Sequence, residues 1–416
     1  MEKTNLLKNL NVIGTNIPIN SFRNISLFVF EKDQTLLISD IWKMFEKEIP
    51  VGLTATWDWI STWIEVYGSL VGYKFILALQ NDEITGIALI TLETHRTFPF
   101  PVRAFHIGTY GEPIKDSMQM TNNRILVKAE SRRLFYDVLI EALSNHFKCE
   151  EIIFDEMSEH EADVLRNVLQ ESGYRFNVDT HTMLYADFDK LRQEKKRVQE
   201  VFSSSMRYAI RRTIKVFADL EIEWPKNRKD AMNIFEELVG LYNENVKKIN
   251  RSGKFASNFY IDFQRKLITK FFDNNSIALL RVKSKKYGTL GCFYFIIDKG
   301  IAYFTQIGLS DVDTLGIDTI SKNRLKIGYL IHALFMEECF NRGLKGYSFS
   351  TGVYQYKLQL TNAREYNYTI SVKKSFKPIL RDKIFKLYTK IDSKRRATFP
   401  IRILRFLVNN LSSRLA

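Results

Sequence analysis

The chain has 416 residues, enough for two or three domains, and its 45% hydrophobic and 26% charged residues are typical of a globular protein. It contains no apolar run of the roughly 18 residues that span a bilayer, no signal-peptide pattern and no Cys/His spacing that suits zinc. We therefore expect a cytoplasmic protein without a metal ion. Its three cysteines, Cys149, Cys292 and Cys339, stand in apolar settings and are expected to be buried free thiols.

The net charge of +14 is unevenly distributed along the chain. Residues 373–416 hold thirteen basic and two acidic residues, a net of +11, so the first 372 residues carry only about +3. Any argument for binding to nucleic acid or to a membrane therefore depends on this C-terminal tail.

The first half of the chain is predicted to alternate strands and helices. Thr56 is a candidate N-cap, and Asn81-Asp82 is a candidate hairpin turn. The predicted order is strand 25–31, helices 33–49 and 56–68, strands 73–80, 84–93 and 102–110, helix 130–147, strand 150–157, helix 159–173 and strand 174–187.

The second half repeats this order at an offset of roughly 190 to 205 residues, which indicates an internal duplication. The fold class is therefore α/β, with two tandem lobes that each contain a mixed β-sheet flanked by helices. The predicted elements are strand 218–224, helices 228–249 and 257–273, strands 276–283, 289–298 and 301–310, helix 324–343, strand 344–350, a short helix within 351–362 and strand 365–376.

A basic helix is predicted between the two halves. Ser203-Ser204-Ser205 can cap it, and Arg207 and Arg211 share one helix face because they are four residues apart. Two readings remain open for this helix, a solvated connector or an arginine pair that faces an anionic group of the substrate.

The element order resembles the GNAT acyltransferase fold, and three stretches resemble the CelD/BcsL-like acetyltransferases within it. These are the aromatic helix "TWDWISTWIEVYG", the arginine-rich "SSSMRYAIRRTIK" and the signature "YSFSTGVYQYKLQL". In that signature Phe349, Gly352, Tyr356 and Lys357 match, whereas Ser348 stands where the group has Asp. The resemblance covers roughly residues 24–376 and implies an N-terminal lobe 1–187, a C-terminal acyltransferase lobe 188–376 and a basic amphipathic helical tail 377–416.

The resemblance implies that acetyl-CoA or another acyl-CoA is the co-substrate. In GNAT lobes its pantetheine arm lies between two parallel strands that separate, and its pyrophosphate lies at the N-terminus of the next helix, where N–H groups favour an anion. In the C-terminal lobe this place holds the expected cofactor-binding residues Lys322, Arg324, Lys326 and Gly328, with Gly352 nearby. The N-terminal counterpart has no glycine between Pro113 and the helix and carries Asp116 and Glu130, so we expect that lobe to lack a cofactor site.

The resemblance to GNAT enzymes also implies a tyrosine on the short helix that protonates the departing thiolate; Tyr356 is the first candidate and Tyr354 the second. Lys357 could hold a phosphate or an acceptor carboxylate; alternatively, Tyr356 packs at an interface and Lys357 is solvated. His332 lies at an apolar helix position that favours core packing. The candidate bases are Asp311, Asp313, Asp318 and Glu244. We assign Tyr356, Lys357 and Asp318 to catalysis, and Arg207, Arg211 and Glu244 to substrate binding.

No Ser-His-Asp or Cys-His arrangement is evident, which favours direct transfer without an acyl-enzyme. The sequence therefore predicts an acyl-CoA-dependent N-acyltransferase that acts on an amino group of a sugar or cell-envelope precursor. Two alternatives are a FemABX-like transferase that uses aminoacyl-tRNA and a catalytically silent binding protein at the membrane. For the tail 377–416, packing onto the protein, contact with the inner face of the membrane, and RNA binding all remain open.

Overall fold

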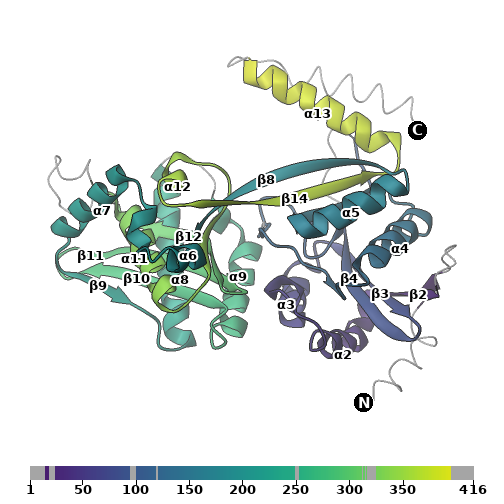
Figure 1. The fold of residues 1–416 in the computed structure, drawn as a ribbon, viewed down its shortest axis with the longest axis horizontal. Helices are drawn as coiled ribbons and strands as arrows, with labels where there is room; N and C mark the ends of the chain where they lie inside the picture. The colour runs from purple at the N-terminus through teal and green to yellow at the C-terminus, as the bar shows by residue number, and fades with distance from the viewer. Residues whose placement is uncertain are drawn as a thin grey trace. The chain divides into compact units, whose positions relative to one another are not determined.

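The computed structural model describes residues 15–17, 24–93, 100–118, 120–248, 253–311, 313, 315 and 325–394. These residues form two compact units. Unit 1 contains the described residues up to Thr180 together with those from Tyr368 onward, and unit 2 contains His181–Asn367. Figure 1 shows the fold of both units and labels many of their helices and strands.

Unit 1 follows the predicted order of strands and helices. Its strands are β1 (Thr15–Ile17), β2 (Ile25–Phe30), β3 (Gly72–Gln80), β4 (Glu83–Glu93), β5 (Ala104–Ile107), β6 (Leu126–Val127) and β7 (Glu151–Ser158), and its helices are α2 (Thr35–Phe45), α3 (Trp57–Tyr67), α4 (Arg132–Asn145) and α5 (Glu159–Glu171), with 3₁₀ turns η1 (Lys32–Gln34) and η2 (Leu53–Ala55). Strand β8 (Arg175–Asp187) continues from unit 1 into unit 2.

The local signals in this half of the sequence are confirmed. Asn81 and Asp82, which join β3 to β4, have φ angles of 51° and 61°, the left-handed values that a tight hairpin turn requires. The Thr56 hydroxyl accepts a hydrogen bond from the Trp59 amide at 3.3 Å and caps α3.

Helices cover both faces of the sheet in unit 1. Because side chains alternate along a strand, β3 sends Ile76 and Ala78 into the core beneath α4 and α5, while Phe75 on the opposite face contacts the rings of Trp42 and Trp57 from α2 and α3. Both faces are therefore buried, as the continuous apolar runs predicted.

Unit 2 repeats this plan. After α6 (Phe188–Gln193) and η3 (Val198–Val201) its elements are α7 (Ser204–Val216), β9 (Leu220–Glu223), α8 (Arg228–Lys248), η4 (Lys254–Ala256), α9 (Asn258–Phe271), β10 (Ile277–Ser284), β11 (Gly288–Asp298), β12 (Ile301–Leu309), α11 (Ile327–Asn341), β13 (Gly346–Thr351), α12 (Gln355–Leu358) and β14 (Ala363–Lys373). Strand β14 ends in unit 1, where α13 (Phe376–Lys394) follows it.

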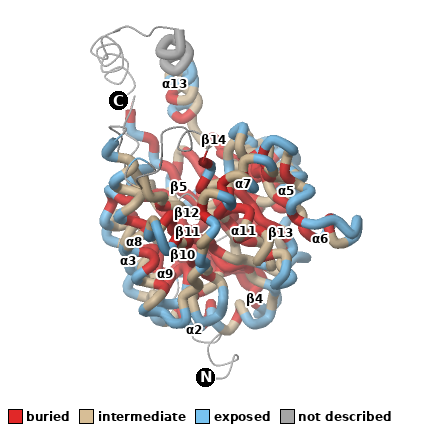
Figure 2. Tube along the Cα trace, turned by 90° about the vertical axis from the view of Figure 1, so that its left-hand side faces the viewer, coloured by how far each residue is buried: buried red, intermediate tan, exposed pale blue. Residues whose placement is uncertain are grey.

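The core of unit 2 has the same two layers. Phe293 and Phe295 of β11 pack with α7 and α11, whereas Tyr294 faces α8, where its ring contacts Phe235. Figure 2 shows that buried residues lie along the central strands and exposed residues lie on the outer helices. The three cysteines are buried free thiols, as predicted.

The hydrogen-bond registers support the duplication. β3 pairs with β4, and β10 with β11, through antiparallel ladders that each contain one bulge, at Thr85 and at Leu290. In each half one parallel pair interrupts the antiparallel order, β5 with β7 in unit 1 and β12 with β13 in unit 2. The predicted mixed sheets flanked by helices are therefore confirmed.

One expectation is corrected, that of two separate sheets. The hydrogen-bonded strands run in the single order β1-β2-β3-β4-β5-β7-β14-β8-β13-β12-β11-β10-β9. Thus β14, the last strand of the second repeat, lies beside β7, and β8, the last strand of the first repeat, lies beside β13. The repeats exchange their last strands, which explains why unit 1 includes residues from the C-terminal part of the chain.

The first part of the predicted basic tail is the helix α13, which packs on unit 1. Leu380 and Ile384 contact Phe100 and Val102. The rest of the tail, residues 395–416, lies outside the described residues. Among the described residues, no helix is both long and apolar enough to cross a membrane.

Candidate functional site

The parallel strands β12 and β13 separate in unit 2. They pair only over Ile301–Tyr303 and Gly346–Ser348, although β12 continues to Leu309. Beyond this short ladder, no strand among the described residues pairs with the edge of β12 that faces β13. A parallel sheet that opens at the carboxyl ends of its strands is a common place for a ligand.

Two backbone irregularities accompany the separation. In the β11–β12 ladder Tyr294 pairs with Gln306 and Phe295 with Phe304, so Thr305 is the extra residue of a bulge, which bends β12. In β13 Ser350 is left-handed, with φ of 56°, and its hydroxyl donates to the Phe304 carbonyl oxygen at 3.0 Å. The two strands are therefore bridged by a side chain where backbone pairing has stopped.

Tyr356 lies near this opening within a stack of aromatic rings. Its ring is nearly parallel to those of Tyr329, 5.9 Å away between centroids, and Tyr354, 6.3 Å away. Tyr354 is 60% exposed, whereas Tyr356 is half-buried. Burial, with the neighbouring phenols, raises the pKa of Tyr356 to about 12. Its hydroxyl therefore keeps its proton at neutral pH, as an acid requires.

Lys357 is buried, with only 4% of its surface exposed. Its Nζ donates to the carbonyl oxygens of Phe349 and Thr351, each at 2.7 Å, and lies 5.1 Å from the centre of the Tyr354 ring. Burial lowers the pKa of Lys357 to about 8. The structure thus disagrees with the reading of Lys357 as a solvated side chain.

His332 packs in the core of unit 2, as its helix position indicated. Its Nδ1 lies 2.5 Å from the Tyr347 hydroxyl, and the Phe293 and Phe304 rings contact its ring edge to face. Burial and, secondarily, the charge of Lys357 lower the pKa of His332 to about 3, so the imidazole is neutral.

Ser348, which stands in the place of the expected Asp, is also buried. Its hydroxyl accepts a hydrogen bond from the Ser350 amide at 3.1 Å. The residue therefore supports the irregular end of β13, and a short hydroxyl is sufficient for that contact. Gly352 follows with φ of 95°, where a Cβ atom would lie 2.9 Å from the Tyr354 ring.

The predicted phosphate site lies at the start of α11. Lys326 is the exposed N-cap residue, its amide donates to the Thr213 hydroxyl at 3.1 Å, and Gly328 lies in the first turn. Lys322, Arg324 and the candidate base Asp318 lie outside the described residues. These assignments remain predictions.

The two arginines of α7 differ in their contacts. Ser203 caps the helix, as predicted, by accepting from the Met206 amide. Arg207 is half-buried and donates to the Phe202 carbonyl oxygen at 2.8 Å, whereas Arg211 is exposed and donates to the Arg207 carbonyl oxygen at 3.3 Å. Arg211 is thus more accessible to an anion than Arg207.

The other candidate bases that the structure describes are exposed or form an ion pair. Glu244 is exposed on α8, and the carboxylate of Asp311 forms an ion pair with Lys248. The role of Asp313 as a candidate base stays a prediction. None of the described residues is therefore singled out by its geometry as the base.

Unit 1 contains a buried charged cluster that the sequence analysis missed. His106 of β5 lies between Asp155, 2.6 Å from its Nδ1, and Glu93, 3.4 Å from its Nε2. Burial alone would lower the pKa of His106, but the two carboxylates raise it to about 10, so the imidazole is charged. Glu112 is also buried, and burial raises its pKa. The available signal was a histidine within the apolar strand "VRAFHIGTY".

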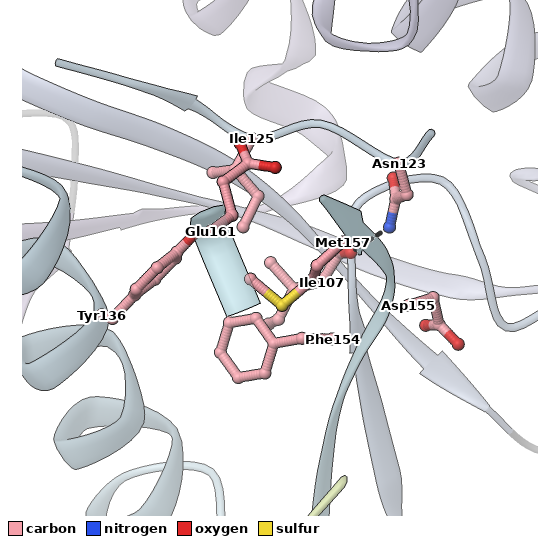
Figure 3. A pocket seen from close by; sticks show the side chains of 8 residues that line it. All are labelled: Ile107, Asn123, Ile125, Tyr136, Phe154, Asp155, Met157 and Glu161. Atoms are coloured by element: carbon pink, nitrogen blue, oxygen red, sulfur yellow. Dashed lines mark hydrogen bonds between the residues drawn. The ribbon is translucent and has the colours of Figure 1, made fainter. Parts of the chain in front are cut away.

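The place in unit 1 that corresponds to the β12–β13 opening is filled by the chain itself. β5 pairs with β7 along its whole length and then turns at Gly108, where φ is 99°. The Asn123 amide donates to the Ile107 carbonyl oxygen at 2.6 Å. Figure 3 shows Asn123, Asp155 and Glu161 around the small pocket that remains at this strand end.

Comparison with known proteins places the opened strands within a recognised family domain. Residues 204–358 match the family model described as the acetyltransferase (GNAT) domain. This segment begins with α7 and ends with α12, so it contains β12, β13 and the aromatic stack. No curated protein matches the chain.

Comparison with solved structures finds similarity at low sequence identity. FemX superposes with a TM-score of 0.51 at 10% identity, covering 80% of this chain and 95% of FemX. L-PGS from Bacillus licheniformis superposes with a TM-score of 0.48 at 11% identity, covering 84% of this chain and 96% of L-PGS. A tandem GNAT protein from the clavulanic acid biosynthesis pathway superposes with a TM-score of 0.38 at 9% identity, covering 84% of this chain and 99% of that protein.

The repeated mixed sheet, opened between two parallel strands of unit 2, defines an α/β transferase fold of the GNAT kind. The family match assigns residues 204–358 to a GNAT-type N-acyltransferase domain.

Proposed function

We propose that the protein transfers an acyl group from acyl-CoA directly to the amino group of a sugar or cell-envelope precursor. The separation of β12 from β13 is the observation that carries this proposal. The donor's pantetheine amides would pair with the open edge of β12 beyond Tyr303, as an added strand does. The carbonyl that reacts would then lie near Tyr356.

The start of α11 would bind the donor's phosphates. The first turn of a helix has unpaired N–H groups and a positive dipole end, and exposed Lys326 adds a cation there. Arg211 on α7 provides a second exposed cation in the same unit. In unit 1 the corresponding strand end is occupied by Asn123, which supports a donor site in unit 2 alone.

Tyr356 would act as the acid. The amine nitrogen attacks the thioester carbonyl carbon, the carbon–sulfur bond breaks, and the thiolate takes the phenolic proton of Tyr356. The rings of Tyr329 and Tyr354 hold this phenol in place. The proton of the amine would pass to Asp318, the candidate base that the sequence analysis assigns to catalysis.

Replacing Tyr356 with Phe tests this role. The Tyr356→Phe variant should lose turnover by roughly 10²- to 10⁴-fold and keep its melting temperature, because only a hydroxyl is removed. Turnover is measured as CoA released from acetyl-CoA with an amino sugar such as glucosamine as acceptor. Tyr366→Phe, on the exposed side of β14, is the matched control. Turnover of Tyr356→Phe within twofold of the wild type would exclude the acid role.

The CelD/BcsL-like assignment belongs to the same proposal. Its support is that Phe349 of β13, Gly352 of the following turn, and Tyr356 and Lys357 of α12 lie in one strand–turn–helix segment, in which Lys357 hydrogen-bonds to Phe349. The likeness in fold to FemX favours a second candidate, a FemABX-like transferase that uses aminoacyl-tRNA. Thermal shifts with acetyl-CoA and with aminoacyl-tRNA separate the two candidates, because each ligand stabilises only a protein that binds it.

A further inference from the structure

The end of β13 is a strained segment that needs support from its surroundings. Ser350 is a non-glycine residue in the left-handed region and Gly352, two residues later, is left-handed as well. A residue held in such a conformation destabilises the fold and persists only where neighbouring contacts fix it. The Ser350 hydroxyl, on the Phe304 carbonyl oxygen, provides one such contact.

Lys357 provides two more contacts. Its ammonium group donates to the carbonyl oxygens of Phe349 and Thr351, the residues that flank Ser350. These carbonyls consequently have a donor that does not come from a neighbouring strand. β13 can therefore stop pairing with β12 after Ser348 without leaving the carbonyl oxygens of Phe349, which is buried, and Thr351 unsatisfied.

The ammonium of Lys357 has no carboxylate partner among the described residues. Among the described residues, the titratable groups that face it are His332 on α11, which is neutral, and the phenol of Tyr354. Burying a cation with carbonyl partners alone costs stability relative to a paired charge. A lysine at this position is thus explained poorly by stability and better by the conformation that it holds.

We infer that Lys357 is a positioning residue: it clamps the left-handed end of β13, which keeps the β12–β13 opening in shape and presents Tyr356 from the next turn. This differs from the expected contact of Lys357 with a phosphate or an acceptor carboxylate, because both described hydrogen bonds go to the backbone. The importance of Tyr356 rests on the proposed function, whereas the clamp does not.

Two substitutions distinguish a role of the Lys357 hydrogen bonds from a role of its positive charge. Lys357→Gln keeps two N–H donors and removes the charge, and Lys357→Met removes both. A clamp predicts that Lys357→Met loses at least tenfold in CoA release from acetyl-CoA with glucosamine, whereas Lys357→Gln stays within about threefold of the wild type. Lys345→Met, an exposed lysine just before β13, is the matched control and should change nothing.

Amide hydrogen exchange tests the clamp without any substrate. Peptides that cover residues 349–358 should exchange at least tenfold faster in Lys357→Met, and near the wild-type rate in Lys357→Gln and Lys345→Met. If Lys357→Met fails to fold, the Lys357→Gln result alone decides, since the clamp requires wild-type protection there.

Two outcomes would overturn the inference. One is equal loss of turnover in Lys357→Gln and Lys357→Met with unchanged exchange, which would assign a role to the charge. The other is loss of amide-exchange protection over residues 349–358 in a folded Lys357→Gln variant. If the wild type releases no CoA while the exchange pattern follows the clamp, the proposed function fails and the clamp stands.

Discussion

At the scale of single residues, the partners of a buried charged group indicate whether it stabilises the fold or shapes the candidate site. Glu151 of β7 is buried against Lys373 and Arg381, whose side chains reach it from β14 and α13. Burial would raise the pKa of Glu151, but the two cations and a hydrogen bond from Ser371 lower it to about 2. This network has complete charge partners, in contrast to Lys357, and we assign it to stability.

Glu151 predicts a dependence of stability on pH. Because the pKa of Glu151 in the folded protein lies below its ordinary value of 4.5, its contribution to stability is present above pH 4.5 and is lost as the pH falls from about 4.5 to 2. The Glu151→Gln variant should unfold about 3 kcal/mol more easily in urea at pH 7 and lose this pH dependence. In the control Glu171→Gln, an exposed partner of Arg133, the change should be below about 1 kcal/mol. Equal stabilities of the two variants would show that the network contributes little.

Local signals were predictable from the sequence, whereas side-chain environments were not. The caps at Thr56 and Ser203 and the turn at Asn81-Asp82 are confirmed because their hydrogen bonds and φ angles involve residues only a few positions apart. The burial of Lys357 and of His106 depends on strands distant in sequence. Lysine is seldom buried, so composition and spacing gave no signal for the first of these.

Gly352 predicts the effect of a single methyl group on the site. With φ of 95° and a Cβ position 2.9 Å from the Tyr354 ring, Gly352→Ala strains the turn before α12. The variant should lose about 1–3 kcal/mol of stability and most of its turnover, measured by thermal unfolding and CoA release. Gly173→Ala has a similar left-handed φ but open space around it, so it should cost stability and leave the turnover unchanged. Full activity of Gly352→Ala would argue that the turn tolerates displacement.

At the scale of elements, the start of α11 and the opening of β12 from β13 set where a donor can bind. The order and type of these elements were predictable, because the apolar periods of strands and helices differ. The opening itself was implied only by resemblance, since a strand whose ladder stops early has the same apolar pattern as one that is fully paired.

Lys326→Glu tests the anion site at the start of α11. Reversing this charge beside the helix N-terminus should weaken CoA binding at least tenfold in calorimetry, because attraction of the phosphates becomes repulsion. Lys299→Glu, at the turn between β11 and β12, reverses the same charge away from α11 and should leave the affinity unchanged. Unchanged CoA affinity of Lys326→Glu would show that the phosphates do not bind at the start of α11.

At the scale of the whole molecule, the exchange of the last strands is the feature that the sequence did not predict. The strands 175–187 and 363–373 have similar patterns, and either could pair beside β7 or β13. Only the long-range hydrogen-bond register decides between the two pairings, and no local signal encodes it.

The exchange predicts that the first repeat does not fold as a separate chain. A fragment of residues 1–187 would lack β14 beside β7, as well as Lys373 and Arg381 around Glu151. It should give neither a cooperative melting transition nor dispersed amide resonances. A folded fragment with wild-type stability would show that β8 can take the place of β14.

Binding of an acyl donor is the most direct test of the central claim that unit 2 is a working GNAT site. At a concentration 100 times its dissociation constant, acetyl-CoA should stabilise the full chain by about 2.7 kcal/mol in a thermal-shift titration. Lys326→Glu should shift that titration to higher ligand concentration. A melting temperature that no CoA ester changes but aminoacyl-tRNA raises would contradict the account.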